Sequence, residues 1–389
     1  MSTFTSTVAF RWLGHDRGMH RRRLILGGMA VGAAWLAGCR GDDPDPAPDT
    51  ATTAPTTAPP TTSSAGPRPI DPQLDGTIAS GLNVPWAIVF LADGTALVTQ
   101  RDDASIVRVS PDGQVTKVGD VPGVAPGGEG GLQGLAVAPG DESALYAYLT
   151  GPDDNRVVRL EFDGDQLGEA EPIVTGLRKA FNHQGGALTF DRDGHLFVAV
   201  GDAAVADTAQ DRDSRNGKIL RIDTRGRAVE GNPFGNEVWS WGHRNIEGLA
   251  WDGEGRLWAS EFGDQDTDEL NHIVKGGNYG WPIVEGDGGD DRYVRPKATW
   301  SPAEASPAGL AISGDRAFVA ALRGERLWQV PLDGTSAGKP RAFFTGEWGR
   351  LRAVAAAPDG SLWVGTSNTD GRGDPAKGDD RLVRVVISQ

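Results

Sequence analysis

A short pattern of residues recurs six times along this chain of 389 residues. Each copy combines small and apolar residues, a turn that contains Asp or Gly, and a second apolar stretch. The first copy consists of Pro85–Phe90, the turn Asp93-Gly94 and Ala96–Val98. The other copies begin at or near Gly134, Gly186, Gly248, Gly309 and Ala353. Since a repeated unit of this kind cannot bury its apolar face alone, the copies must pack against one another.

Each copy predicts two antiparallel strands joined by a tight turn. Further strand candidates lie between the copies, at Ser105–Ser110, Arg156–Phe162 and Arg326–Pro331. Four strands in each of six units predict an all-β fold, a six-bladed β-propeller of four-stranded antiparallel blades. We expect the last strand, Leu382–Ile387, to close the ring beside the first copy. A pair of β-sandwiches would not require six equivalent units.

The first 39 residues have the pattern of an export signal. Basic residues up to Arg23 precede an apolar run, Leu24–Leu36, which is too short to span a bilayer. The run ends in Leu36-Ala37-Gly38-Cys39, which resembles a bacterial lipobox and predicts that Cys39 is lipidated and becomes the mature N-terminus. The alternatives are an ordinary signal peptide with an incidental cysteine, a twin-arginine signal at residues 21–25, and a true start at Met19.

Residues 40–72 are rich in Asp, Pro, Ala, Thr and Ser and predict a disordered linker between the anchor and a propeller domain at residues 73–389. The predicted location is therefore outside the cytoplasm, with the domain held at the membrane only by its lipid.

Composition excludes several classes of function. The net charge is -15, from 38 basic and 53 acidic residues, and no basic run follows residue 40, which argues against a nucleic acid partner. The single cysteine excludes an internal disulfide and a zinc cage of thiolates. The sequence also lacks the P-loop, GxSxG and HExxH motifs, so phosphoryl transfer, α/β-hydrolase chemistry and zinc proteolysis have no support.

Polar residues gather just before the repeated strands, where a propeller builds the loops of one face. Two candidate groups stand out there: His183 before the third copy as a general base, and an arginine set that would bind a multiply anionic ligand. The alternatives are a structural histidine and arginines that each pair with a local carboxylate. The set comprises Arg244, Arg323, Arg350 and Arg352.

The stretch Glu261–Glu269 and the following Gly276–Pro282 are dense in oxygen ligands and in glycines that free backbone carbonyls. This composition suits calcium, although the spacing is not that of an EF-hand, and a solvated acidic turn is the alternative.

A longer motif identifies a family. Gly242-His243-Arg244-Asn245 with Gly248-Leu249, then Asp268–Asn271, then Lys275–Pro282, resembles the soluble aldose sugar and glucose dehydrogenases that use pyrroloquinoline quinone (PQQ). With the blade pattern, the resemblance covers about residues 78–389 and implies a six-bladed propeller that holds PQQ over the mouth of its channel.

The resemblance also implies a role for each matching residue. His183 would take the proton of the sugar hydroxyl while hydride passes to the quinone, and Arg244 would stabilise the charge that develops on the quinone oxygen. Other contacts to the quinone would come from Glu129, Asn245, Arg323, Arg350 and Arg352. Calcium for the cofactor would be bound by carbonyls of Gly263 and Asp264, and a second, structural calcium by Glu269 and the carbonyl of Tyr279.

The sequence departs from the family at five positions, one of which is Arg323, where these enzymes have Lys. Glu129 stands where these enzymes have Gln, Asn182 where the glucose enzymes have Asp, and Ile246 and Asp264 where Pro is usual. A carboxylate at 129 would repel an anionic cofactor unless it were protonated or turned away.

The leading hypothesis is a lipid-anchored dehydrogenase that depends on PQQ and calcium. It would oxidise an aldose at its anomeric hydroxyl to a lactone and pass electrons to an external acceptor. The alternatives are a non-catalytic propeller that binds a glycan or protein at the cell surface, and a calcium-dependent lactonase.

Overall fold

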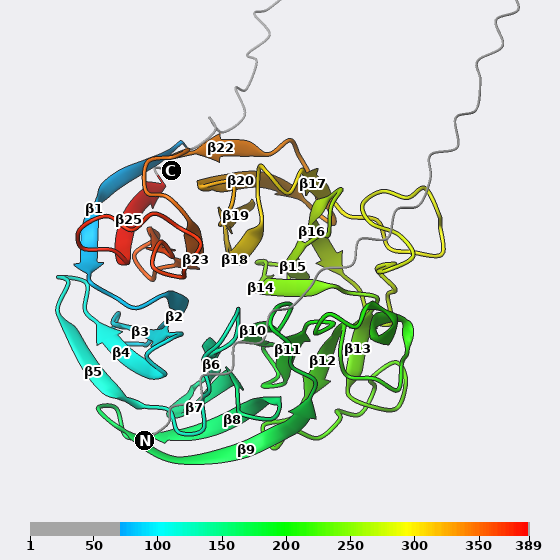
Figure 1. Cartoon of the computed structure of the whole chain (residues 1–389), viewed down its shortest axis with the longest axis horizontal. Coiled ribbons are helices and arrows are strands. Elements are labelled where there is room, and N and C mark those ends of the chain that lie inside the picture. Colours follow the sequence, from blue (N-terminus) through cyan, green and yellow to red (C-terminus); the bar gives the residue numbers. More distant parts are fainter. Residues whose placement is uncertain (1–70, 388–389) are drawn as a thin grey trace, which may run out of the picture. The chain divides into compact units, whose positions relative to one another are not determined.

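The computed structural model describes residues 71–387, which form six antiparallel sheets arranged around a central axis (Figure 1). This confirms the predicted six-bladed propeller. Within these residues the only helical segment is the short 3-10 helix η1 (Ala206–Gln210), and no helix of residues 71–387 is long and apolar enough to cross a membrane. The predicted export signal, Cys39 and the linker up to residue 70 lie outside the described residues.

Every blade has the same strand order, from the channel outward. The inner strands are β2 (Pro85–Phe90), β6 (Leu132–Ala138), β10 (Gly185–Phe190), β14 (Asn245–Trp251), β18 (Pro307–Ser313) and β23 (Leu351–Ala356). The second strands are β3 (Ala96–Gln100), β7 (Asp141–Thr150), β11 (Leu196–Val200), β15 (Leu257–Phe262), β19 (Arg316–Ala321) and β24 (Leu362–Thr366). The third strands are β4 (Ser105–Val109), β8 (Asn155–Phe162), β12 (Lys218–Ile222), β16 (Asp268–Ile273), β20 (Arg326–Asp333) and β25 (Arg381–Ile387). The outer strands are β5 (Val115–Asp120), β9 (Leu167–Leu177), β13 (Val238–Trp241), β17 (Ala298–Trp300), β21 (Ser336–Ala337), β22 (Arg341–Phe343) and β1 (Pro72–Ser80). In the fifth blade both β21 and β22 pair with β20.

The ring closes through the two ends of the domain. β25 pairs on one side with β24 and on the other with β1, so the first strand of the domain is the outer strand of the last blade. The expectation that Leu382–Ile387 closes the ring beside the first copy is confirmed, since Leu382 packs in one buried cluster with Ala96 and Val98, while its hydrogen-bonded neighbours are β24 and β1. β1 gave no sequence signal since most of its residues are exposed or half-buried, as at an outer edge of a sheet.

The hydrophobic core lies between neighbouring blades. One buried cluster, for example, combines Tyr146 and Tyr148 of the second blade with Phe190 and Val198 of the third. The glycine that opens most copies is a packing requirement. A Cβ added at Gly134 would lie 2.0 Å from the carbonyl oxygen of Gly186, on the inner strand of the next blade. Only glycine therefore lets the inner strands approach one another around the channel.

The topology brings two kinds of loop to the same face. Inner strands begin at this face, and their antiparallel second strands end there, so the loops before the inner strands meet the loops after the second strands. Between them the inner strands surround a narrow channel of about 130 Å³. We call this end of the channel the mouth.

Candidate functional site

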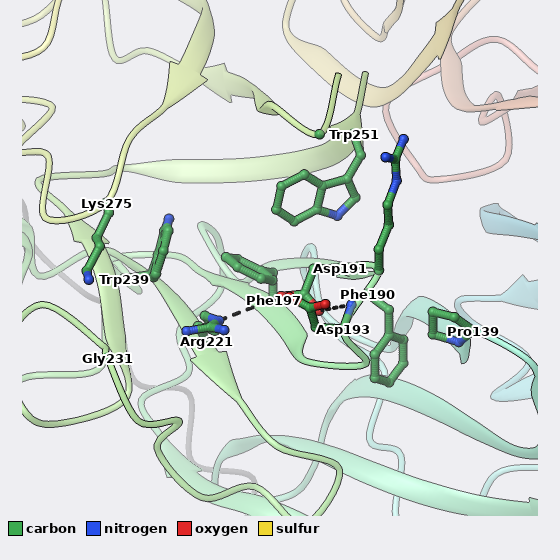
Figure 2. A pocket seen from close by; sticks show the side chains of 12 residues that line it. Pro139, Phe190, Asp191, Asp193, Phe197, Arg221, Gly231, Trp239, Trp251 and Lys275 are labelled. Atoms are coloured by element: carbon green, nitrogen blue, oxygen red, sulfur yellow. Dashed lines mark hydrogen bonds and ion pairs between the residues drawn. The ribbon is translucent and has the colours of Figure 1, made fainter. Parts of the chain in front are cut away.

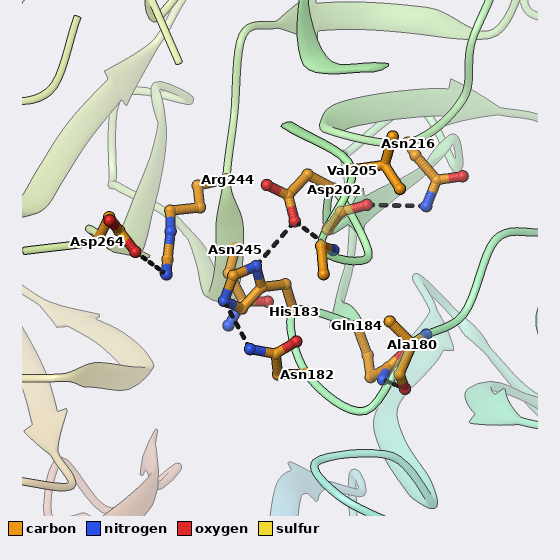
Figure 3. A network of polar contacts seen from close by, with 12 residues as sticks. Ala180, Asn182, His183, Gln184, Asp202, Val205, Asn216, Arg244, Asn245 and Asp264 are labelled. Atoms are coloured by element: carbon orange, nitrogen blue, oxygen red, sulfur yellow. Dashed lines mark hydrogen bonds and ion pairs between the residues drawn. The ribbon is translucent and has the colours of Figure 1, made fainter. Parts of the chain in front are cut away.

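His183 lies at the mouth, just before β10, and Figure 3 shows its ring held between Asp202 and Asn182. Its backbone has a φ of 58°, in the left-handed region that is uncommon for residues other than glycine. The His183 N–H donates to Glu129 Oε2 at 2.9 Å, Nδ1 lies 2.8 Å from Asp202 Oδ1, and Nε2 lies 3.1 Å from Asn182 Nδ2. These contacts fix both the backbone and the ring.

Asp202 orients the histidine ring and selects its tautomer. It follows β11 and is 1% exposed, and its carboxylate accepts hydrogen bonds from the N–H of Ala204 and from Trp281 Nε1, both at 2.8 Å. An ionised carboxylate only accepts, so Nδ1 of His183 carries the proton and donates. Nε2 is then the unprotonated nitrogen, which agrees with the Asn182 amide as its donor. The ring therefore presents a basic Nε2, and sequence reasoning missed the residue that arranges it.

Three of the predicted arginines are paired with carboxylates. Arg244 Nη2 lies 2.9 Å from Asp264 Oδ1, and its guanidinium stacks 5.3 Å from the centre of the Trp281 ring. The other two pairs join Arg350 Nη2 to Asp370 Oδ2 at 2.9 Å and Arg352 Nη1 to Glu247 Oε2 at 2.6 Å. The local-carboxylate alternative therefore describes these three side chains, whereas Arg323 is exposed.

Arg372 is another arginine at the mouth, and sequence reasoning did not single it out. It belongs to the loop between β24 and β25, and its Nη1 lies 2.7 Å from Glu129 Oε1. The signal that could have found it is its glycine-rich surroundings, Gly371-Arg372-Gly373, ahead of the closing strand. Each of the four paired arginines thus has its own carboxylate, and the formal charges within each pair cancel.

Burial affects these carboxylates differently. Burial raises the pKa of Glu247, and its attraction to Arg352 offsets only part of that effect. Burial also opposes ionisation of Glu129, but the hydrogen bonds from Arg372 and the His183 N–H outweigh it and lower the pKa of Glu129. The pKa of Asp370 is lowered because Arg350 and Arg352 outweigh its burial. Glu129 and Asp370 are therefore ionised at neutral pH.

Asn245 is buried and serves the scaffold. Its Oδ1 accepts the N–H of Gly185 at 2.9 Å, and its Nδ2 lies 3.3 Å from Glu247 Oε1. These bonds tie the start of β14 to the start of β10. His243 is likewise a buried residue of the scaffold, since it stacks on Tyr279 with ring centres 4.5 Å apart and its Nδ1 lies 3.0 Å from Glu261 Oε2.

Three of the four predicted metal ligands line one small cavity. Gly263, Glu269 and Tyr279 surround it together with Glu261 and Glu285, and its volume of about 10 Å³ has room for about one small ion or water. Glu261 and Glu269 are cross-strand partners on β15 and β16. The side chain of the fourth predicted ligand, Asp264, turns to Arg244 instead.

Among the described residues, the three carboxylates around this cavity outnumber the one cation that also lines it, Arg244, and this balance favours a bound cation. Burial, and then the repulsion from Glu261, raise the pKa of Glu269 to about 8. Asn271 Nδ2 donates to both carboxylates, to Glu261 at 3.1 Å and to Glu269 at 2.8 Å, while its buried Oδ1 has no hydrogen-bond partner among the described residues. Carboxylate and carbonyl oxygens around a space of this size fit calcium.

A wider cavity of about 880 Å³ lies at the opposite ends of β10 and β14 (Figure 2). Its walls include Phe197, Trp239 and Trp251, and two of its charged side chains are linked through His195: Arg221 Nη2 lies 2.9 Å from His195 Nδ1, which lies 3.0 Å from Asp191 Oδ2. His195 is half-buried. None of the predicted site residues lines this cavity.

The fold and the residues at the mouth define a class of protein. The pattern of the glucose/sorbosone dehydrogenase family matches residues 82–383, and the chain belongs to that family. It is therefore an oxidoreductase, and the family resemblance seen in the sequence is confirmed.

Individual relatives are similar over most of their length. The aldose sugar dehydrogenase of Streptomyces coelicolor, solved in its PQQ-bound form, is 47% identical with a TM-score of 0.80, over 83% of this chain and 99% of that chain. A glucose dehydrogenase-like oxidoreductase of Thermus thermophilus is 38% identical with a TM-score of 0.76, over 82% and 100%. The aldose sugar dehydrogenase of Escherichia coli (strain K12) is 29% identical over 333 residues, 75% of this chain and 89% of that protein.

Proposed function

We propose that this protein oxidises aldose sugars at the anomeric hydroxyl to lactones, with PQQ and calcium as cofactors and an external electron acceptor. The observation that carries the proposal is His183, which Asp202 and Asn182 hold at the mouth that also carries Arg244, Arg350 and Arg352. The similarity to an aldose sugar dehydrogenase solved with PQQ supports the choice of cofactor.

The donors at the mouth fit a planar ligand with several carboxylates. Arg244 keeps a buried Nε without an acceptor among the described residues, and its guanidinium lies over the ring of Trp281. Arg244 and Asn245 would face the quinone oxygens, and Arg323, Arg350 and Arg352 would bind the carboxylates, with Glu129 at the edge of the same space. When bound there, the quinone supplies the acceptor for the hydride of the sugar.

The residues of the chain handle the proton. His183 Nε2 takes the proton of the anomeric hydroxyl, and the charge that appears on the imidazole is stabilised by Asp202, 2.8 Å from Nδ1. Arg244 lies within the same network, because Asp202 accepts from Trp281, on which Arg244 stacks. Its positive charge stabilises negative charge that develops on an oxygen at the mouth.

Calcium would bind in two places. Glu269 and the Tyr279 carbonyl, with Glu261 and Glu285, would hold an ion in the small cavity between β15 and β16. Carbonyls of Gly263 and Asp264 would hold the ion that accompanies the cofactor.

Turnover of the purified protein tests the proposal. PQQ and calcium are added, and dye reduction is followed with a panel of aldoses. We expect turnover that requires both additions and disappears with a chelator. If no quinone binds by calorimetry and no sugar is oxidised, the alternative of a binding propeller or a lactonase replaces this proposal.

The location of the protein is a separate proposal, supported by the lipobox-like Leu36–Cys39 alone. We propose that Cys39 carries a lipid and holds the protein at the outer side of the cell membrane. Labelled palmitate should enter the expressed protein and fail to enter the Cys39→Ala variant, and equal labelling of both would refute the anchor.

A further inference from the structure

Glu129 is the site residue that conflicts most with an anionic ligand, and the structure shows how the conflict is relieved. Its two carboxylate oxygens have different partners. Oε1 lies 2.7 Å from Arg372 Nη1, and Oε2 accepts the backbone N–H of His183 at 2.9 Å. The side chain of Glu129 is 15% exposed, whereas that of Arg372 is 47% exposed, so a largely buried carboxylate is paired with a guanidinium that reaches it from the solvent side.

These contacts connect three blades. Arg372 comes from the loop between β24 and β25, Glu129 from the loop between β5 and β6, and His183 from the loop between β9 and β10. Arg372 and Glu129 are 243 residues apart in the sequence. This series of contacts ends at His183. Its backbone has left-handed dihedral angles, a conformation that needs support from the surrounding residues.

The loop of Arg372 is itself held in place. Asp370 Oδ1 accepts the N–H of Arg372 at 2.9 Å, while Asp370 Oδ2 is paired with Arg350. A Cβ at Gly373 would lie 2.8 Å from a backbone atom of Asn368 and 2.9 Å from the Arg350 side chain, so only glycine allows the loop to pass there. The guanidinium of Arg372 is therefore delivered to Glu129 by a fixed loop.

We propose that Arg372 is a positioning residue of this site: its ion pair turns Glu129 from a group that repels an anionic ligand into the acceptor that fixes the backbone of His183. The effect of Arg372 on an anionic ligand rests on the proposed function. The effect of Arg372 on the backbone of His183 is independent of that function. Nothing in the arrangement requires Arg372 to touch the ligand, because its effect passes through Glu129.

A double-mutant cycle separates these roles, since coupling between two residues appears as non-additivity. The variants are Arg372→Met, Glu129→Gln and the pair together. Glutamine at 129 keeps an oxygen that accepts the His183 N–H but has no charge to neutralise. Arg292→Met, an exposed arginine paired only with Asp290, is the matched control.

PQQ affinity, measured by calorimetry with calcium present, is the first readout. We expect Arg372→Met to weaken binding about tenfold or more, because it leaves a carboxylate unpaired beside an anionic ligand, and to change binding less than about twofold when residue 129 is Gln. An equal loss in both backgrounds would mean that Arg372 acts on the ligand directly, and the inference would be wrong.

The second readout needs no ligand or turnover. The ring of His183 faces Asp202 from one side, and its backbone meets Glu129 from another. Histidine-selective ¹⁵N NMR of the cofactor-free protein should show His183 titrating at higher pH in Arg372→Met, since a nearby unpaired negative charge favours the imidazolium, and returning to the wild-type midpoint in the double variant. A merely structural contact would not move this midpoint. If the titration midpoint of His183 is the same in all variants, the inference fails, even when wild-type protein binds PQQ. If wild-type protein binds no PQQ while the midpoint moves as expected, the proposed function fails and the inference stands.

Discussion

The substitution Asp202→Asn tests how the base is oriented. Asp202 accepts three hydrogen bonds, from His183 Nδ1, from the N–H of Ala204 and from Trp281 Nε1, each at 2.8 Å. Asparagine has the same shape but offers one acceptor and one donor group, so it cannot satisfy three donors.

Both orientations of the new amide are unfavourable. If its NH₂ faces Trp281, two donors meet and a buried group loses its partner, at a cost of about 1–3 kcal/mol. If its NH₂ faces His183, Nδ1 must become the acceptor, the proton moves to Nε2, and the nitrogen that should act as base is blocked. Because a positioned general base contributes about 10²–10⁴ in rate, we expect kcat to fall by a factor of that order, with a smaller change in PQQ affinity.

Dye-linked turnover with saturating PQQ and calcium measures the effect, and a denaturant titration verifies folding. The control is Asp191→Asn on the opposite face, where a carboxylate lies 3.0 Å from Nδ1 of another histidine, His195. We expect its kcat to stay at the wild-type level. A kcat of Asp202→Asn within about threefold of wild type would refute this account of the base.

Three further changes have defined outcomes. His183→Ala should abolish turnover but leave PQQ binding by calorimetry largely intact, and wild-type-like turnover would remove His183 from the chemistry. The pKa of Glu269 is raised from its ordinary value of about 4.5 to about 8 in the folded protein without metal. Between these pH values the folded state binds one more proton than the unfolded state. The free energy of unfolding should therefore fall as pH rises through this window, by up to about 1.4 kcal/mol per pH unit. Thermal unfolding in the presence of a chelator should show this pH dependence, and Glu269→Gln should flatten it. Calcium should stabilise the wild type more at pH 8 than at pH 6. A pH dependence that Glu269→Gln leaves unchanged would contradict the assignment to Glu269. Arg352→Met should destabilise the protein by about 3–5 kcal/mol in a urea titration, because it strands the buried Glu247, and adding Glu247→Gln should recover most of the loss; no recovery would show that packing of the arginine, not its charge, matters.

The fold was predictable because its signal is local and repeated. Each copy of the pattern became an inner strand and its hairpin partner, although several inner strands begin two or three residues earlier than the pattern indicated, as β14 does at Asn245 and not at Gly248. The exception is β1, whose mostly exposed residues lack an apolar pattern and which is defined only by its pairing with β25. Hydrophobic patterning predicts strands that line a core and says little about a polar strand that closes a ring.

The site was predictable only in part. Residues that precede an inner strand, such as His183 and Arg244, could be found from the repeat itself. Asp202, Asp370 and Arg372 follow second strands instead, and they reach the mouth only because antiparallel pairing returns the chain to the same face. Their partners lie far away in the sequence, so no local motif announces them.

By itself the sequence determined the number of blades, the face that carries the site and the family to which the chain belongs, because each of these follows from short patterns that repeat or persist along the chain. Only the tertiary structure decided the state of the charges. It paired each buried arginine of the site with a carboxylate, placed Glu129 between Arg372 and the backbone of His183, and put Asp202 behind the imidazole. The physical reason is that charge pairing depends on distances of a few ångströms between loops of different blades, and those distances exist only after the ring has closed.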